Sequence, residues 1–285
     1  MVRRVYGTGD GAAPAVYKSR ASHACNDAMQ TWRRYVESRA FAPPQKRLRY
    51  PEDVAADGVT LECQAVFAAT GVPSVCCKHA AARRVVVFFH GNSANIADDR
   101  VTAFARQLSD AASADVYSPE FPGYHGKGAP SEAALAEAAA AFVTALKART
   151  ENGMQFLVAG YSLGSYPALV TAPLADGVLL VAPLYSALSV VLAQKPWALG
   201  LAWLWRPIDL FRNAPLAAAH GKPQLVVGAA KDAVIPSFQG RALRGSYVEL
   251  AHATHVSAAT DPETFEAISA FLGVQGCPTF KKSHG

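Results

Sequence analysis

The sequence is organised around residues 155–166, which read Gln-Phe-Leu-Val-Ala-Gly-Tyr-Ser-Leu-Gly-Ser-Tyr. The apolar run at residues 156–159 follows a polar, glycine-containing turn, as is typical of a buried parallel strand. Residues 160–164 come next and match the pattern Gly-x-Ser-x-Gly, and the Ala-rich residues 165–172 favour a helix. We therefore predict a strand, a sharp turn and a helix, with Ser162 at the apex of the turn.

The composition indicates a globular protein whose positive charge lies at the N-terminus. The chain has 285 residues, of which 51% are hydrophobic and 17% charged, and its formal net charge is +5. Residues 1–50 hold ten Lys and Arg against three Asp and Glu, so the rest of the chain is slightly acidic. We interpret residues 1–45 as a basic extension with one amphipathic helix around Trp32, which could contact anionic membranes. No motif or aromatic platform for nucleic acid accompanies this charge, so no nucleic-acid partner is expected.

Other features of the composition bear on location and cofactors. No stretch predicts a transmembrane helix, and no apolar segment typical of a secretory signal follows the first residues. The five cysteines are an odd number without a C-x-x-C pair, which favours a reducing compartment over a disulfide framework or a zinc site. We therefore expect a cytoplasmic protein, with peripheral membrane contact through its N-terminus, that needs neither a metal nor a cofactor.

Short apolar runs alternate with helical patterns along the rest of the chain. Strands are predicted at residues 46–50, 59–68, 84–89, 114–118, 156–159, 177–181, 224–228 and 246–250. This alternation predicts an α/β fold with a mostly parallel, twisted sheet of about eight strands and helices on both faces. We assign residues 46–275 to this domain, residues 185–222 to a short lid insertion within it, and residues 276–285 to a C-terminal tail.

A serine at such a turn can act as a nucleophile when a histidine takes its proton and a carboxylate orients that histidine. In this strand–turn–helix arrangement the acid and the histidine follow the serine in that order, each after a strand. Asp232 follows the predicted strand at residues 224–228, and His255 follows the one at residues 246–250. We therefore predict that Ser162, Asp232 and His255 form a catalytic triad.

Two other residues compete for these roles. Asp209 is the alternative acid, because some proteins of this type take the acid from the preceding strand. His252 is the alternative base, but it comes only two residues after the strand. His255 is favoured because its longer loop allows the imidazole to reach the serine.

The tetrahedral intermediate of acyl transfer also needs two N–H donors for its oxyanion. We expect one from the backbone of Leu163, directly after the nucleophile, and one from the backbone of Asn92, in the loop after residues 84–89. His90 in that loop is interpreted as a structural residue that hydrogen-bonds beneath it.

Taken in order, these motifs resemble the α/β-hydrolase superfamily, and within it the α/β-hydrolase-domain proteins that include protein depalmitoylases. The resemblance spans about residues 61–272 and rests on His90-Gly91-Asn92-Ser93-Ala94, Pro122-Gly123-Tyr124, Pro130-Ser131-Glu132, Gly160-Tyr161-Ser162-Leu163-Gly164-Ser165, Ala182-Pro183-Leu184-Tyr185-Ser186 and Lys231-Asp232-Ala233-Val234-Ile235. It implies the α/β-hydrolase fold and a serine hydrolase that cleaves carboxylic esters or thioesters of acyl chains, either small or linked to a protein. The N-terminal cysteine cluster of the depalmitoylases is missing, because Cys25 stands alone. A serine peptidase of the same fold and a non-catalytic ligand-binding protein are the alternatives.

The predicted lid contains an unusually aromatic stretch. Residues 196–205 hold three of the four tryptophans of the chain. A run this apolar, too short to span a bilayer, must be buried in the core, line a pocket or face a lipid surface. We predict that it lines the acyl pocket and that Tyr185, Trp203 and Trp205 bind substrate, with a plain core helix as the alternative.

Overall fold

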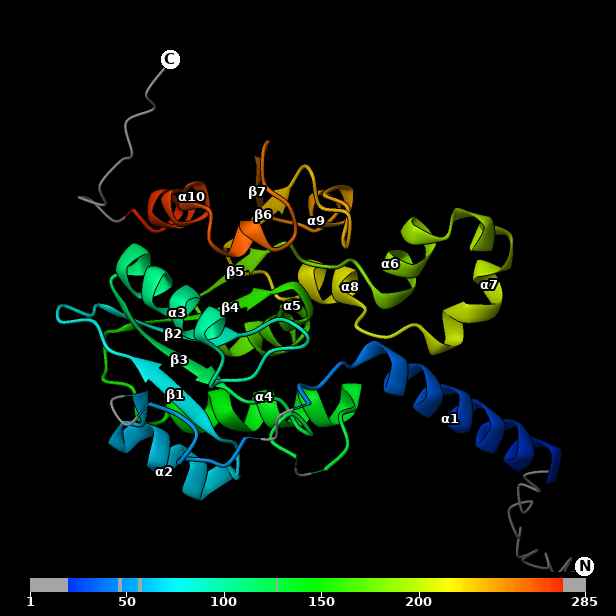
Figure 1. The fold of residues 1–285 in the computed structure, drawn as a ribbon, viewed down its shortest axis with the longest axis horizontal. Helices are drawn as coiled ribbons and strands as arrows, with labels where there is room; N and C mark the ends of the chain where they lie inside the picture. The colour runs from blue at the N-terminus through cyan, green and yellow to red at the C-terminus, as the bar shows by residue number, and fades with distance from the viewer. Residues whose placement is uncertain (1–19, 46–47, 56–57, 127, 274–285) are drawn as a thin grey trace, which may run out of the picture.

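The computed structural model describes residues 20–45, 48–55, 58–126 and 128–273 (Figure 1). Within these residues seven strands form one sheet in the order β1-β3-β2-β4-β5-β6-β7. The strands are β1 (Ser74–Cys77), β2 (Arg84–Phe89), β3 (Ala114–Pro119), β4 (Gln155–Tyr161), β5 (Gly177–Val181), β6 (Gln224–Ala229) and β7 (Ser246–Leu250). Strand β1 pairs with β3 in the antiparallel sense, and every other neighbouring pair is parallel. The predicted mostly parallel sheet is therefore confirmed.

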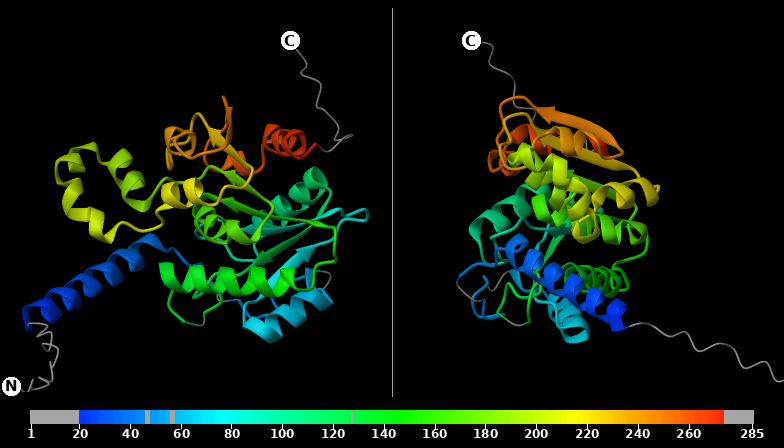
Figure 2. Two further views of the ribbon diagram at one scale, coloured as in Figure 1. Left: turned by 180° about the vertical axis from the view of Figure 1, so that it is seen from behind. Right: turned by 90° about the vertical axis from the view of Figure 1, so that its right-hand side faces the viewer.

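Helices cover both faces of the sheet (Figure 2). Those packed on one face are α2 (Leu61–Thr70), α4 (Glu132–Lys147), α5 (Ser165–Thr171) and α8 (Asn213–Ala219), and those on the other are α3 (Asp99–Ala112) and α10 (Pro262–Leu272). The side chains of β2 alternate between these layers, so that Val85, Val87 and Phe89 pack on one side and Val86 and Phe88 on the other. This two-sided burial explains the continuous apolar run of the strand.

The predicted strand at residues 59–68 is wrong, because this segment forms helix α2. The side chain of Thr60 caps the helix by accepting a hydrogen bond from the backbone N–H of Cys63 at 3.2 Å, and Gly71 ends it in the left-handed region. Cys63 and Val66 lie one helical turn apart on the buried face of this helix. Of the other strand expected here, residues 48–50 lie outside any strand and residues 46–47 lie outside the described part of the chain. Strand β1 was not predicted.

Two segments project from the body on the same side, as both figures show: α1 (Arg20–Ala40) and the excursion between β5 and β6. The excursion contains α6 (Ala187–Gln194), η4 (Pro196–Leu201), α7 (Ala202–Trp205) and η5 (Arg206–Ile208) before α8 returns to the body. Helix α1 contacts η5. A further short helix, α9 (Phe238–Arg241), follows β6. No helix among the described residues is long and apolar enough to cross a membrane.

Candidate active site

The turn after β4 holds Ser162 in a conformation that its neighbours enforce. Ser162 has a φ of 54°, in the left-handed region that residues with a side chain rarely adopt. A Cβ atom added to Gly160 would lie 2.3 Å from the carbonyl oxygen of Gly164, and one added to Gly164 would lie 2.0 Å from that of Phe89. Only glycine fits at these two positions, so the Gly-x-Ser-x-Gly pattern is a packing requirement of the sharp turn.

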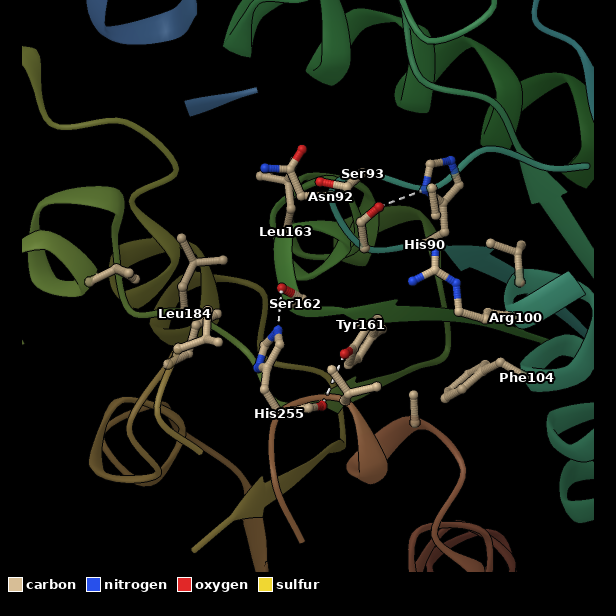
Figure 3. Close-up of a pocket in the computed structure, with 18 of the residues that line it drawn as sticks. His90, Asn92, Ser93, Arg100, Phe104, Tyr161, Ser162, Leu163, Leu184 and His255 are labelled. Carbon is tan, nitrogen blue, oxygen red and sulfur yellow. Dashed lines mark hydrogen bonds between the residues drawn. The ribbon is translucent and has the colours of Figure 1, made fainter. Parts of the chain in front are cut away.

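Ser162, His255 and Asp232 come together at the carboxyl ends of three strands, and Figure 3 shows the contact between Ser162 and His255. The His255 Nε2 atom lies 3.0 Å from Ser162 Oγ, and His255 Nδ1 lies 2.6 Å from Asp232 Oδ2. The other carboxylate oxygen, Asp232 Oδ1, accepts hydrogen bonds from the backbone N–H groups of Val234 at 2.8 Å and Ile235 at 2.7 Å. The carboxylate is therefore fixed on both sides, and the imidazole bridges it to the serine hydroxyl.

Tyr161 holds the histidine loop in place from the strand side. Its hydroxyl donates a hydrogen bond of 2.9 Å to the backbone carbonyl oxygen of His255, and the two rings lie 5.4 Å apart (Figure 3). Burial, together with the nearby Asp232 charge, raises the pKa of Tyr161 to about 12, so the phenol stays protonated and can donate. Tyr161, the residue before Ser162, thus also positions His255, a contact that was not predicted from the sequence.

The competing residues lie elsewhere. Asp209 follows η5 in the excursion, where its Oδ1 atom accepts a hydrogen bond from the backbone N–H of Leu188 at 2.8 Å. The pKa of the Asp209 carboxyl is raised, chiefly by burial. The hydrogen bonds from Leu188 and Ser186 act in the opposite direction but are the weaker influence. His252 is exposed. Asp232 and His255 are therefore the carboxylate and the imidazole that the structure brings to Ser162.

The loop after β2 is held from below by a buried histidine and a buried carboxylate. His90 Nδ1 donates to the carbonyl oxygen of Gly91 at 2.8 Å, and His90 Nε2 lies 3.1 Å from Glu120 Oε1. The second oxygen of Glu120 accepts a hydrogen bond from the backbone N–H of Ile96 at 3.1 Å. Glu120 therefore joins both ends of the loop. This arrangement agrees with a structural role for His90.

The same loop runs against the nucleophile. A Cβ atom added to Gly91 would lie 3.6 Å from the Cβ of Ser162 and 2.9 Å from the ring of Tyr161, so the backbone passes close to the serine. The Asn92 side chain points away into other contacts: it donates to the carbonyl oxygen of Ala40 at 2.9 Å, and it accepts from the backbone N–H of Ala42 at 2.9 Å and from the hydroxyl of Tyr124. Because the side chain is engaged in these contacts, only the backbone N–H of Asn92 could contact an oxyanion.

A cavity of about 580 Å³ opens beside Ser162 and His255. Its walls come from α3, α6, the loop after β2, the loop after β7 and the end of α1. The apolar residues among them are Ala40, Phe88, Ala94, Val101, Phe104, Leu163, Leu184, Ala187, Val190, Val191, Phe211, Val234, Ile235, Val256 and Ala259. An apolar cavity of this kind is typical of a site that binds a small apolar group.

The residues predicted to bind substrate do not line this cavity. Trp203 and Trp205 lie beyond α6 with 68% and 41% of their surface exposed, and Tyr185 is 39% exposed. The reason is that Ser186 caps α6, which presents Val190 and Val191 to the cavity, after which the chain leaves the body. The alternative of a plain core helix does not hold either, because these tryptophans are not buried. The apolar run at residues 187–193 was the signal that could have identified Val190 and Val191.

Comparison with known proteins agrees with this fold. Residues 86–219 match the model of a family described as the alpha/beta hydrolase family. A solved structure of Est1E from Butyrivibrio proteoclasticus matches with a TM-score of 0.53 and 12% sequence identity, covering 70% of this chain and 93% of that one. An esterase from Pyrococcus furiosus matches with a TM-score of 0.54 and 13% identity, covering 71% and 85%. A sequence search among curated proteins finds no match.

These findings confirm the resemblance to the α/β-hydrolase superfamily, and the fold is the α/β-hydrolase fold. At such low identity the solved structures establish the architecture, and the chemistry has to be argued from the site.

Proposed function

We propose that the protein is a serine hydrolase that cleaves carboxylic esters or thioesters of acyl chains. The observation that carries the proposal is the continuous relay from Ser162 through His255 to Asp232, with contacts of 3.0 Å and 2.6 Å. Such a relay makes a serine hydroxyl nucleophilic, because the histidine removes its proton while the carboxylate stabilises the resulting imidazolium. The esterase in the structural comparison and the family match support hydrolase chemistry.

The reaction would proceed in two halves. As Ser162 Oγ attacks the acyl carbonyl carbon, His255 Nε2 takes the hydroxyl proton, and the backbone N–H groups of Leu163 and Asn92 stabilise the oxyanion. The tetrahedral intermediate expels the alkoxide or thiolate, which receives the proton from His255, and the acyl group stays on Ser162. A water molecule then attacks the acyl-enzyme and gives its proton to His255. Collapse of this second intermediate releases the carboxylic acid and returns the proton to Ser162.

The apolar cavity supports an acyl chain as the part of the substrate that is recognised. Each methylene buried there would contribute up to about 0.8 kcal/mol, or about fourfold in kcat/KM. Thioesters are included because the resemblance to the depalmitoylase group implies them, and a thiolate leaves readily.

Two measurements test this function. A fluorophosphonate probe should label the wild-type protein on Ser162, and a series of 4-nitrophenyl esters and acyl-thioesters should show kcat/KM rising with chain length up to a limit. Val190→Trp should shift that limit to shorter chains, because Val190 lines the cavity. Absence of labelling and turnover would favour the non-catalytic alternative. A chain-length profile unchanged in Val190→Trp would mean that the acyl chain binds elsewhere.

A further inference from the structure

All four tryptophans of the chain lie on the two segments that project from the body. Trp32 belongs to α1, and Trp197, Trp203 and Trp205 belong to the excursion after β5. Trp197 and Trp203 have 77% and 68% of their surface exposed, and Leu199 and Leu204 beside them are also exposed. We call Trp32, Trp197, Leu199, Trp203, Leu204 and Trp205 the aromatic surface. Exposed apolar side chains clustered in this way mark an interaction site.

The aromatic surface joins distant parts of the sequence, because α1 and the excursion meet through their aromatic side chains. The rings of Trp32 and Trp205 meet edge to face with centroids 6.4 Å apart, and Tyr35 packs on Trp32 at 5.8 Å. Figures 1 and 2 show α1 running out beside the excursion. Glu132 at the start of α4 ties the bases of both segments to the body, because it pairs with Arg33 of α1 and accepts a 2.6 Å hydrogen bond from the backbone N–H of Phe211.

The surroundings of the aromatic surface are positively charged. The basic residues within residues 29–40 and 194–212 are Arg33, Arg34, Arg39, Lys195, Arg206 and Arg212, all exposed. The only acidic residues in these ranges are Glu37, which is buried and lies 3.6 Å from Arg33, and Asp209, which accepts a hydrogen bond from Leu188. The charge presented to solvent is therefore cationic. The further basic residues Arg3, Arg4 and Lys18 lie outside the described part of the chain.

We propose that the aromatic surface docks on a lipid bilayer that contains anionic headgroups. Tryptophan and tyrosine favour the interface between acyl chains and water, and Lys and Arg around them attract negatively charged headgroups. A second copy of the chain suits the surface less well, because two copies would bring like charges together. The proposed contact is peripheral, since it involves only side chains exposed on the surface of the two segments.

The docking surface continues into the cavity. Ala40 at the end of α1 and Val190 and Val191 of α6 line the cavity beside Ser162, so both projecting segments also form part of its wall. A protein docked in this way would hold its cavity at the bilayer, where acyl chains are concentrated. Docking itself does not depend on the proposed hydrolase activity, and the two can fail separately.

Tryptophan fluorescence provides a direct test, because every tryptophan of the chain belongs to the proposed contact. The full-length protein is mixed with vesicles of phosphatidylcholine alone, or of phosphatidylcholine with phosphatidylserine. With the anionic vesicles we expect a blue shift of the emission, quenching by brominated lipid, and co-sedimentation that weakens with added salt. No shift and no co-sedimentation with anionic vesicles would overturn the proposal.

Matched variants distinguish binding through the aromatic surface from non-specific adsorption to vesicles. The double variant Trp197→Ser and Trp203→Ser should lower the vesicle partition coefficient by at least about tenfold. The double variant Arg34→Glu and Arg206→Glu should remove the preference for anionic lipid. Leu61→Ser should change neither the partition coefficient nor the lipid preference. Leu61 is the control because it is 80% exposed on α2, away from the projection (Figure 1). Equal binding by the tryptophan variant would overturn the proposal, as would a wild-type dimer that this variant dissociates without any vesicle binding.

Discussion

The body around the sheet and the projection formed by α1 and the excursion differ in where they place their large apolar side chains. In the body, Phe88, Phe89 and Phe121 are almost fully buried around the sheet, whereas in the projection Trp197 and Trp203 are among the most exposed of the large hydrophobic residues described. The side chains around the sheet are closely packed. The conformation of Ser162 is therefore determined by its neighbours. The exposed residues of the projection carry no such constraint. Substitutions in the body should therefore change chemistry, and those in the projection should change where the protein binds.

The largest effect is expected at the nucleophile. Ser162→Ala should reduce ester hydrolysis by on the order of a millionfold, because the variant lacks the hydroxyl that is proposed to form the acyl-enzyme. The fold should persist, since Ser162 Oγ makes its contact with His255 at the surface of the cavity. Turnover of a 4-nitrophenyl ester measures the loss, and thermal unfolding followed by circular dichroism is the control. Substantial residual turnover in this variant would show that another residue is the nucleophile.

The body was predictable from the sequence where the signal is local. Gly160 is required by a contact within its own turn and Gly164 by a contact with the neighbouring strand β2, so the pattern and the geometry coincide. Asp232 and His255 could be assigned because the loops that follow parallel strands meet at one edge of the sheet, which gives chain order a spatial meaning.

Other parts depend on tertiary contacts that no pattern contains. The clamp between Asn92 and Ala40 joins residues 52 positions apart, and nothing in either stretch indicates it. The segment 196–205 shows the limit of composition most directly. Its apolar character predicts that these side chains contact apolar material. Whether that material is the protein core, a ligand or a lipid depends on the orientation of the flanking helices. For residues 59–68, the cap at Thr60 and the helical spacing of Cys63 and Val66 were present in the sequence and compete with the strand-like run.

The second prediction compares the two candidate acids. Asp232→Asn should lower kcat/KM on the order of thousands-fold, because an amide can stabilise neither the imidazolium nor the required tautomer of His255. Asp209→Asn should have little effect on the chemistry, because its carboxylate accepts from the backbone of Leu188. Steady-state kinetics on one soluble ester measures both variants. A greater loss in the Asp209 variant would move the acid to the excursion.

A smaller effect is expected where the body meets the projection. Asn92→Ala removes the side-chain hydrogen bonds to Ala40, Ala42 and Tyr124 but leaves the backbone N–H of residue 92. Leaving these groups without partners should lower the free energy of unfolding by about 1–3 kcal/mol. A shift of the loop should lower kcat by up to about a hundredfold with little change in KM, because the oxyanion exists only after attack.

Asn92→Asp is the matched control for this clamp. It keeps the oxygen that accepts from Ala42 and Tyr124, and it replaces the nitrogen that donates to Ala40 with a charged carboxylate oxygen. We therefore expect its kcat to lie between those of the wild type and the alanine variant. If the alanine variant loses stability but keeps its full kcat, the clamp is structural and the loop does not contribute to the oxyanion contact.

The smallest effect is expected from Trp203→Ala acting on a soluble, monomeric ester. Trp203 is mostly exposed and does not line the cavity, so the dependence of kcat/KM on acyl chain length should match that of the wild type. The same variant should lose activity on an ester embedded in anionic vesicles, because the substrate is then reached only by docking. Leu61→Ser, on the far side of the body, should keep the wild-type rate on both substrates. A changed chain-length profile on the soluble ester would return Trp203 to the acyl pocket. An unchanged rate on the vesicle-embedded ester would mean that Trp203 does not contribute to reaching a substrate in the bilayer.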